Sequence, residues 1–293
     1  MSRTPRLVVL AAGLLAAGCS GLFESPTEPT PAPNPDEIGY TALGASDGIG
    51  YGSSVVCAPL DTGCENGKGY VQEIRRRLMA TGKTVTYLNL SIPGFVLSPA
   101  IQTLASDIGR EVPGNILDRE APFVPPTTTV VTVFAGGNDA NVLAQAALAG
   151  RGGADLKGYL DERIRQWGND YGSLLTRVRA RAPSARFVLL NLPNMAAAPY
   201  VDGNTQSERS ILQYITVGLA DRVNALAGAN VAVVDLLCTA SLYDRANFSS
   251  DGFHPSDSGY QLMADLTFPV VAGTGGTSPQ PTCAARSFFP PAF

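Results

Sequence analysis

Five short apolar runs, rich in β-branched residues, alternate along the chain with longer segments of helical periodicity. The apolar runs cover residues 38–43, 84–90, 128–134, 186–190 and 231–236. Helical segments are expected at residues 68–80, 98–109, 156–181, 207–226 and 256–266. Continuous apolar runs of this length are typical of parallel strands that are buried on both faces. The alternation therefore predicts βαβ crossovers and a three-layer α/β/α sandwich on a parallel sheet.

The N-terminus has the pattern of an export signal. Arg3 and Arg6 precede an apolar run over residues 7–17 that leads to Cys19. The run is shorter than the roughly 20 residues that a membrane-spanning helix needs. Its end, Leu-Ala-Ala-Gly-Cys, resembles a bacterial lipobox, which implies cleavage before Cys19 and lipidation of its thiol. An ordinary secretory signal with an incidental cysteine is the alternative. Because Ser20 and not an aspartate follows the cysteine, the lipoprotein resemblance implies anchoring in the outer membrane of a cell that has one.

The N-terminal pattern divides the chain into three predicted parts. Residues 1–18 are predicted to be a lipoprotein signal peptide. Residues 19–36 are expected to form a lipidated, proline-rich tether, because they hold too few bulky apolar residues to fold. Residues 37–293 have a length that suits one α/β domain.

The charge and the cysteines narrow the class of protein. The formal net charge is −4 without a Lys/Arg cluster, so nucleic acid is a poor partner. Besides Cys19 there are four cysteines, an even number that indicates disulfides in an exported chain, with three possible pairings. Zinc ligation would need closer Cys/His spacing. We favour two pairs, one closing a short loop and one tying the C-terminal tail to the body: Cys57–Cys64 and Cys238–Cys283.

Polar residues stand where the predicted strands end, which is where open parallel sheets bind their ligands. Ser46 follows the first strand, Gly94 the second and Asn138 the third. The loop after the fifth strand holds Asp251 and His254, the only histidine of the chain. Each motif alone is also typical of an ordinary turn or helix cap. Their order at the ends of successive strands predicts a catalytic site.

These motifs resemble those of the SGNH (GDSL-type) hydrolase family over residues 40–260. The matching residues, block by block, are Ser46, Gly94, Asn138, and Asp251 with His254. The resemblance implies a flavodoxin-like sheet of five parallel strands and a serine esterase or lipase activity. The final block, Asp-Gly-Phe-His-Pro, is its most specific part.

One position departs from the family pattern. The family usually has Gly-Asp-Ser followed by an apolar residue, whereas this chain has Gly44, Ala45, Ser46 and Asp47. The missing carboxylate at Ala45 raises the question of what holds the turn that carries the serine. We expect Asp47 to supply an equivalent hydrogen bond from the other side.

The expected mechanism is that of a serine hydrolase. His254 accepts the proton of Ser46 as the serine attacks an ester carbonyl, and Asp251 holds the imidazole in the required tautomer. The backbone N–H groups of Ser46 and Gly94 and the side-chain amide of Asn138 are expected to stabilise the oxyanion. Water then releases the acyl-enzyme.

Apolar residues near the predicted site favour an acyl or aryl group as substrate. They are Ile92, Phe95, Met195, Ala196, Ala197, Ala198, Phe248 and Phe253. We therefore expect hydrolysis of short- to medium-chain carboxylic esters, whether lipids or other small molecules. An O-acetyl esterase acting on polysaccharide, or a non-catalytic lipid- or glycan-binding lipoprotein, is the alternative.

Three further expectations complete the prediction. The sequence has no nucleotide-binding loop and no metal-ligand cluster, so no cofactor and no metal are expected. The protein is expected to act as a monomer. The Ala/Gly-rich stretch of residues 141–153 is interpreted as a mobile flap near the site or as a long loop.

Overall fold

The computed structural model of the protein describes residues 36–276 and 278–293. The predicted signal peptide of residues 1–18, the lipidation site Cys19 and the tether up to residue 35 lie outside the described residues. In the described part, none of the helices combines the length and the apolar character that a membrane span requires.

Five parallel strands form one sheet in the order β2-β1-β3-β4-β5. The strands are β1 (Glu37–Gly44), β2 (Thr84–Asn89), β3 (Val130–Phe134), β4 (Arg186–Leu190) and β5 (Val231–Val234). The chain moves outward from β1 to β2 and then returns to the other side of β1 as β3. This reversal opens a crevice at the carboxyl ends of β1 and β3, where ligands bind in sheets of this kind. Gly44 pairs with Phe134 there, so the two strands end side by side.

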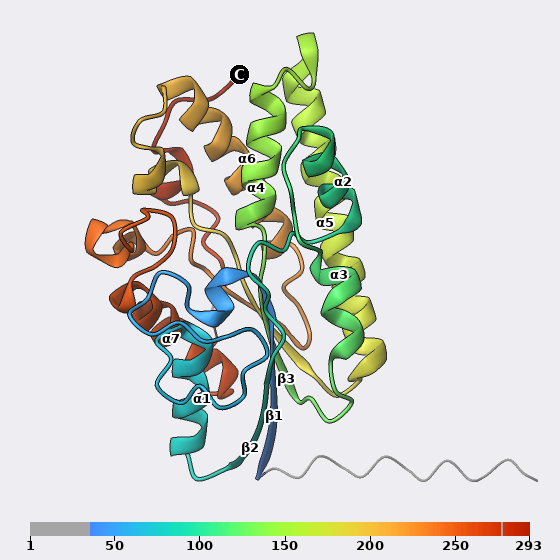
Figure 1. Ribbon diagram of the computed structural model, residues 1–293, viewed down its shortest axis with the longest axis vertical. Helices are drawn as coiled ribbons and strands as arrows, with labels where there is room; N and C mark the ends of the chain where they lie inside the picture. The colour runs from blue at the N-terminus through green and yellow to red at the C-terminus, as the bar shows by residue number, and fades with distance from the viewer. Residues whose placement is uncertain (1–35, 277) are drawn as a thin grey trace, which may run out of the picture. The chain divides into compact units, whose positions relative to one another are not determined.

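Helices cover both faces of the sheet (Figure 1), and the predicted three-layer α/β/α sandwich is confirmed. Helices α1 (Tyr70–Ala80) and α7 (Asp257–Val271) pack on one face. The helices on the opposite face are α2 (Pro99–Asp107), α3 (Ile116–Arg119), α4 (Gly137–Leu148), α5 (Leu156–Arg181) and α6 (Gln206–Asn224).

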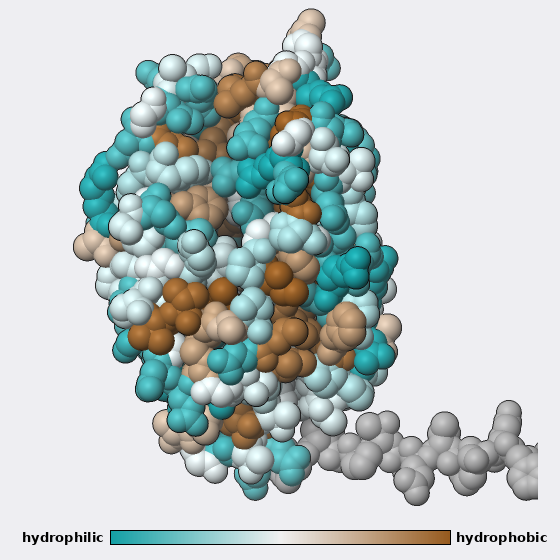
Figure 2. Space-filling model, in the orientation of Figure 1, coloured by the Kyte–Doolittle hydropathy of each residue, from teal (hydrophilic) through white to brown (hydrophobic). Residues whose placement is uncertain are grey.

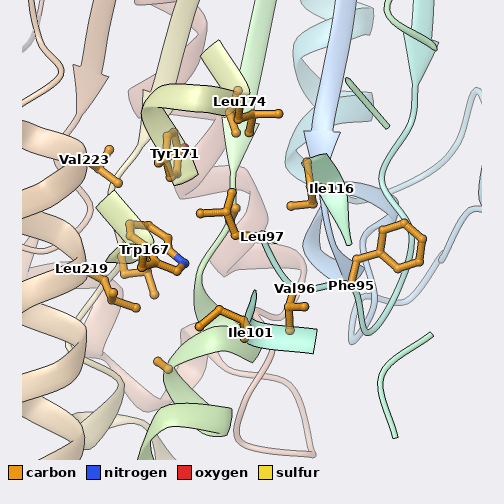
Figure 3. Packing of buried hydrophobic residues seen from close by; sticks show 14 of the residues in the cluster. Phe95, Val96, Leu97, Ile101, Ile116, Trp167, Tyr171, Leu174, Leu219 and Val223 are labelled. Carbon is orange, nitrogen blue, oxygen red and sulfur yellow. The ribbon is translucent and has the colours of Figure 1, made fainter. Parts of the chain in front are cut away.

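Two apolar cores, one on each face of the sheet, hold these layers together. Each strand contributes to both cores, because successive strand residues point to opposite faces. On β3, Val131 belongs to the core under α2–α6 and Val130 to the core under α1 and α7. Figure 3 shows the larger core, in which Trp167 of α5 lies near Leu219 of α6, and Tyr171 of α5 near Val223 of α6. Both rings are fully buried, with centroids 5.1 Å apart. This core fixes the helices that carry part of the site.

The prediction of a flap or long loop at residues 141–153 is wrong. Most of this stretch belongs to helix α4. Val142, Leu143, Ala146 and Ala147 are buried, at the spacing that places residues on one face of a helix. The alanines, which have the highest helix propensity, favour the helical state further.

The other predicted helices are observed, with one difference in length. Four of them match to within two residues at either end. Helix α7 continues five residues past its predicted end at 266, because Val270 and Val271 remain buried in the core. The short helix α3 was not predicted.

Both predicted disulfides are present. Cys57 and Cys64 are joined with their Cα atoms 5.8 Å apart, and Cys238 and Cys283 with theirs 5.6 Å apart. The first closes a loop beside the carboxyl end of β1. The second ties the C-terminal tail to the segment that follows β5.

Candidate active site

The predicted serine, histidine and aspartate form one hydrogen-bonded row at the carboxyl edge of the sheet. Ser46 begins a 3-10 helix (Ser46–Ile49) directly after β1, and its side chain is buried. His254 Nε2 lies 2.9 Å from Ser46 Oγ, and His254 Nδ1 lies 2.6 Å from Asp251 Oδ2. Both distances are within the reach that a nucleophile, its base and the group that orients the base require.

The loop that carries Asp251 and His254 is held by the aspartate itself. Asp251 Oδ1 accepts hydrogen bonds from Ser249 Oγ at 2.7 Å, from the Phe253 N–H at 2.8 Å and from the His254 N–H at 2.9 Å. Gly252, at φ +70°, supplies the left-handed residue that the turn needs. Burial works to raise the pKa of Asp251, but the hydrogen bonds from His254, Ser249 and Phe253 outweigh it and lower the pKa to about 2.

Two aromatic rings contact the imidazole. The Tyr51 ring lies 4.7 Å from the His254 ring between centroids, and the Phe253 ring lies 4.6 Å from it in an edge-on arrangement. These contacts and the bond to Asp251 leave the imidazole little rotational freedom. The ring is therefore fixed with Nε2 toward Ser46.

The predicted oxyanion donors lie on three different elements. Gly94 occupies the left-handed position, φ +80°, of a turn closed by a bond of 3.2 Å from the Phe95 N–H to the Ile92 carbonyl. Asn138 Nδ2 donates to the Phe95 carbonyl at 2.9 Å and so ties this turn to α4. Among the described residues, no hydrogen bond uses the backbone N–H of Ser46 or that of Gly94. Both N–H groups are therefore available to a ligand.

A small cleft brings part of this set together. Its walls include Ser46, Asn138 and Phe95. Gly94 does not line the cleft itself, although it directly precedes Phe95. The cleft thus contains the nucleophile Ser46 and the predicted donor Asn138, but not the predicted donor Gly94.

Glu120 holds the turn that carries the nucleophile. Its Oε2 accepts the Gly44 N–H at 2.9 Å. The side chain is completely buried, which raises the pKa of Glu120 well above its usual value, against hydrogen bonds from the N–H groups of Gly44 and Ile92. Glu120 therefore holds Gly44, whose carbonyl in turn accepts the Ile92 N–H of the Gly94 turn at 3.3 Å. The expectation that Asp47 supplies this bond is wrong, because the chain provides a carboxylate from a distant helix end instead.

A second buried carboxylate, Asp139, links Asn138 to the core. Asp139 Oδ1 accepts the indole N–H of Trp167 at 3.0 Å and the backbone N–H of Leu97 at 2.9 Å. Its Oδ2 is buried without a hydrogen-bond partner among the described residues. Burial raises the pKa of Asp139 to about 6 despite the two bonds.

This raised pKa makes stability depend on pH. The folded protein keeps a proton on Asp139 that the unfolded chain, with an ordinary pKa of 3.8, releases. Stability is therefore lost as the pH rises from about 4 to about 6. Between about pH 4 and pH 6, we expect the free energy of unfolding to fall by roughly 2–3 kcal/mol more in the wild type than in Asp139→Asn. Urea unfolding across this range, beside the exposed control Asp107→Asn, measures it. Identical pH slopes in the wild type and Asp139→Asn would contradict the assignment.

A second hollow, of about 70 Å³, adjoins the cleft. Phe134, Gly137 and Phe253 line both, so the two are neighbours. The remaining walls are mostly apolar and come from the segments after β4 and β5, among them Leu192, Met195, Tyr200, Leu236, Tyr243 and Phe248. We call this hollow the acyl cavity.

The apolar residues expected near the site are partly found there. Phe95 lines the cleft, and Met195, Ala198, Phe248 and Phe253 line the acyl cavity. The other three expected residues, Ile92, Ala196 and Ala197, line neither hollow. The aromatic walls from Phe134, Tyr200 and Tyr243 were not predicted, although Phe134 does end a predicted strand.

A serine, a histidine and an aspartate in one row at the edge of a parallel sheet are the arrangement of a serine esterase. Comparison with known proteins agrees with this class. The sequence matches the GDSL-like Lipase/Acylhydrolase family over residues 42–262. The chain belongs to this family and is a hydrolase of the esterase and lipase type, as predicted. No curated protein is similar enough to the sequence to match it.

Several solved structures share the fold. A lipase from a goat rumen metagenome is 19% identical at a TM-score of 0.54, over 82% of this chain and 98% of that one. Phospholipase A1 from Streptomyces albidoflavus is 18% identical at a TM-score of 0.50, over 81% and 99%. An acetyl xylan esterase from Geobacillus stearothermophilus is 15% identical at a TM-score of 0.50, over 82% and 96%. At these identities the likeness concerns the fold alone.

Proposed function

We propose that the protein hydrolyses short- to medium-chain carboxylic esters through an acyl-enzyme on Ser46. The observation that carries this proposal is the row from Ser46 Oγ through the His254 ring to Asp251, with distances of 2.9 and 2.6 Å. A serine hydroxyl becomes an effective nucleophile only when a neighbouring base takes its proton. The geometry supports His254 in that role.

Each half-reaction uses the same groups. Ser46 attacks the ester carbonyl, His254 takes the serine proton and then gives it to the leaving alcohol, and Asp251 stabilises the imidazolium. Water then attacks the acyl-enzyme, loses a proton to His254 and releases the acid. The negative charge of each tetrahedral intermediate is stabilised by the N–H groups of Ser46 and Gly94 and by the amide of Asn138.

The surroundings of the site support an apolar ester. The acyl cavity of about 70 Å³ gives room for an acyl group of a few carbon atoms. The loop that contacts His254 carries four large exposed apolar side chains and no charged residue over residues 51–60. They are Tyr51, Val55, Val56 and Leu60, between 38% and 53% exposed. Figure 2 shows hydrophobic surface over this loop, the blue loop of Figure 1. Such a border favours a lipid-like ester over a polysaccharide.

A series of nitrophenyl esters of increasing acyl length tests the proposal, with an acetylated glycan beside it and Ser46→Ala as the blank. We expect the highest kcat/KM for short acyl chains and covalent labelling of Ser46 by a fluorophosphonate. Preferred turnover of the glycan would favour the alternative, an O-acetyl esterase of polysaccharide. Absence of both labelling and turnover would favour the other alternative, a non-catalytic binder.

The amide of Asn138 gives a prediction of intermediate size. Asn138→Ala removes one oxyanion donor and should lower kcat by about 10²–10³. Asn138→Ala also removes the bond to the Phe95 carbonyl and shortens the side chain. Asn138→Asp is therefore measured beside it, because its carboxylate keeps the size of the side chain but cannot donate a hydrogen bond. Steady-state kinetics on a short nitrophenyl ester measures both variants. A change of less than threefold in either would show that Asn138 does not contact the oxyanion.

We also propose that the protein is exported and anchored by a lipid on Cys19, with residues 19–36 as a tether from the outer membrane. The support for this is the sequence of the N-terminus. Metabolic labelling with a fatty acid tests it, with Cys19→Ser as the control. Equal labelling of both proteins, or of neither, would remove the anchor.

A further inference from the structure

Asp47 is the only charged side chain among the described residues that line the cleft and the acyl cavity. It follows Ser46 directly, at a position where the family pattern has an apolar residue. Asp47 therefore lines both the cleft beside the nucleophile and the acyl cavity. An ionisable group in such an apolar hollow is costly unless something pairs with it.

The protein supplies Asp47 with few donors. Among the described residues, the hydrogen-bond donors near its carboxylate are its own backbone N–H and the hydroxyl of Tyr260. That hydroxyl has one proton, which it donates to the Tyr51 carbonyl at 2.7 Å. Desolvation raises the pKa of Asp47, and the nearby charge of Asp251 adds to it, while His254 works in the opposite direction. The carboxylate thus keeps unused capacity to accept a hydrogen bond.

We propose that Asp47 makes the acyl cavity selective for short acyl groups that carry a hydroxyl. This inference rests on the proposed function, since it assigns the acyl group of the ester to this cavity. A hydroxyl on a short acyl chain donates to the Asp47 carboxylate. A plain alkyl chain of the same length leaves the carboxylate buried without a donor, which a site built for a hydroxyl penalises.

Asp47 also lies close enough to His254 to interact with it electrostatically, and this gives a distinct expectation. A carboxylate that acts through the imidazole changes the turnover of every ester by the same factor. A carboxylate that contacts the acyl group changes the ratio between two esters. The ratio therefore separates recognition of the substrate from support of the base.

The test compares nitrophenyl butyrate with nitrophenyl 2-hydroxybutyrate and 3-hydroxybutyrate, each rate divided by the rate of alkaline hydrolysis of the same ester. We expect the wild type to favour at least one hydroxy ester in kcat/KM. In Asp47→Leu this preference should fall by about ten- to a hundredfold, the range for a hydrogen bond to a charged group. Asp47→Asn retains an acceptor of the same size and should keep part of the preference.

Met195→Leu is the matched control, because it changes an apolar wall of the same cavity and should leave the ratio unchanged. A hydroxyl preference that is absent in the wild type, or that survives in Asp47→Leu, overturns the proposal. So does an equal loss on all three esters, which would assign Asp47 to the support of His254. Failure of the proposed function looks different, since the wild type would then turn over none of the esters and Ser46 would not be labelled by a fluorophosphonate.

Discussion

Replacing either Ser46 or His254 with alanine should lower kcat on a nitrophenyl ester by about 10⁶. The serine hydroxyl and the imidazole are 2.9 Å apart and share one proton, so neither works without the other. The chain has no second histidine that could replace the base. What remains in each variant should be the modest acceleration that binding and the oxyanion donors provide.

The double variant Ser46→Ala/His254→Ala makes this prediction sharper. Because the two side chains act as a unit, its kcat should be little lower than that of either single variant. Ser106→Ala, at an exposed position on α2, is the control and should keep full turnover. Kinetics on highly purified protein measures all four. Substantial turnover by His254→Ala would show that another group takes the serine proton.

The layers and the row of catalytic residues could be predicted because local signals determine them. A run such as residues 128–134 is apolar throughout, and in a parallel sheet both of its faces must be covered. Once the strands are located, the rule that ligands bind at their carboxyl ends places Ser46 and Asn138 together. The lone histidine then leaves one candidate for the base.

The bracing of the site could not be predicted, because it depends on contacts between distant parts of the chain. Glu120 accepts the N–H of Gly44 from 76 positions away, and nothing in its own neighbourhood marks it. Asp139 stands in the first turn of α4, where an acidic residue ordinarily caps the helix, whereas its carboxylate accepts the indole N–H of Trp167 of α5. Helix α4 was missed because its small residues resemble those of a loop. Only the packing against α2, α5 and α6 gives it a buried face.

The substitution Asp251→Asn should lower kcat by about 10⁴, more than the loss of one oxyanion donor and less than the loss of Ser46. It preserves the size of the side chain and removes its charge. Oδ1 of Asp251 accepts three hydrogen bonds, from Ser249, Phe253 and His254, so in the variant the amide oxygen must occupy this position. The amide nitrogen is then placed where Oδ2 was, facing His254 Nδ1.

An amide nitrogen in that place donates a hydrogen bond, so His254 Nδ1 has to accept it. The proton of the neutral imidazole then sits on Nε2, which faces Ser46 and can no longer take the proton of the hydroxyl. Because the pKa of Asp251 is lowered to about 2, the wild-type carboxylate is charged at every pH used for assays. In the variant the amide is uncharged at every pH, and a higher pH does not move the proton of the neutral imidazole from Nε2 to Nδ1, so raising the pH should not restore wild-type turnover.

A pH series of kcat/KM for Asp251→Asn and for the exposed control Asp244→Asn measures this effect. The control should match the wild type, because the carboxylate of Asp244 is exposed and accepts no hydrogen bond among the described residues. Asp251→Glu keeps the charge but lengthens the side chain, so it should recover part of the lost rate if the tautomer of His254 is what Asp251 controls. Equal losses in the Asn and Glu variants would show instead that the shape of the loop, held by the three bonds to Oδ1, is the main contribution of Asp251 to catalysis.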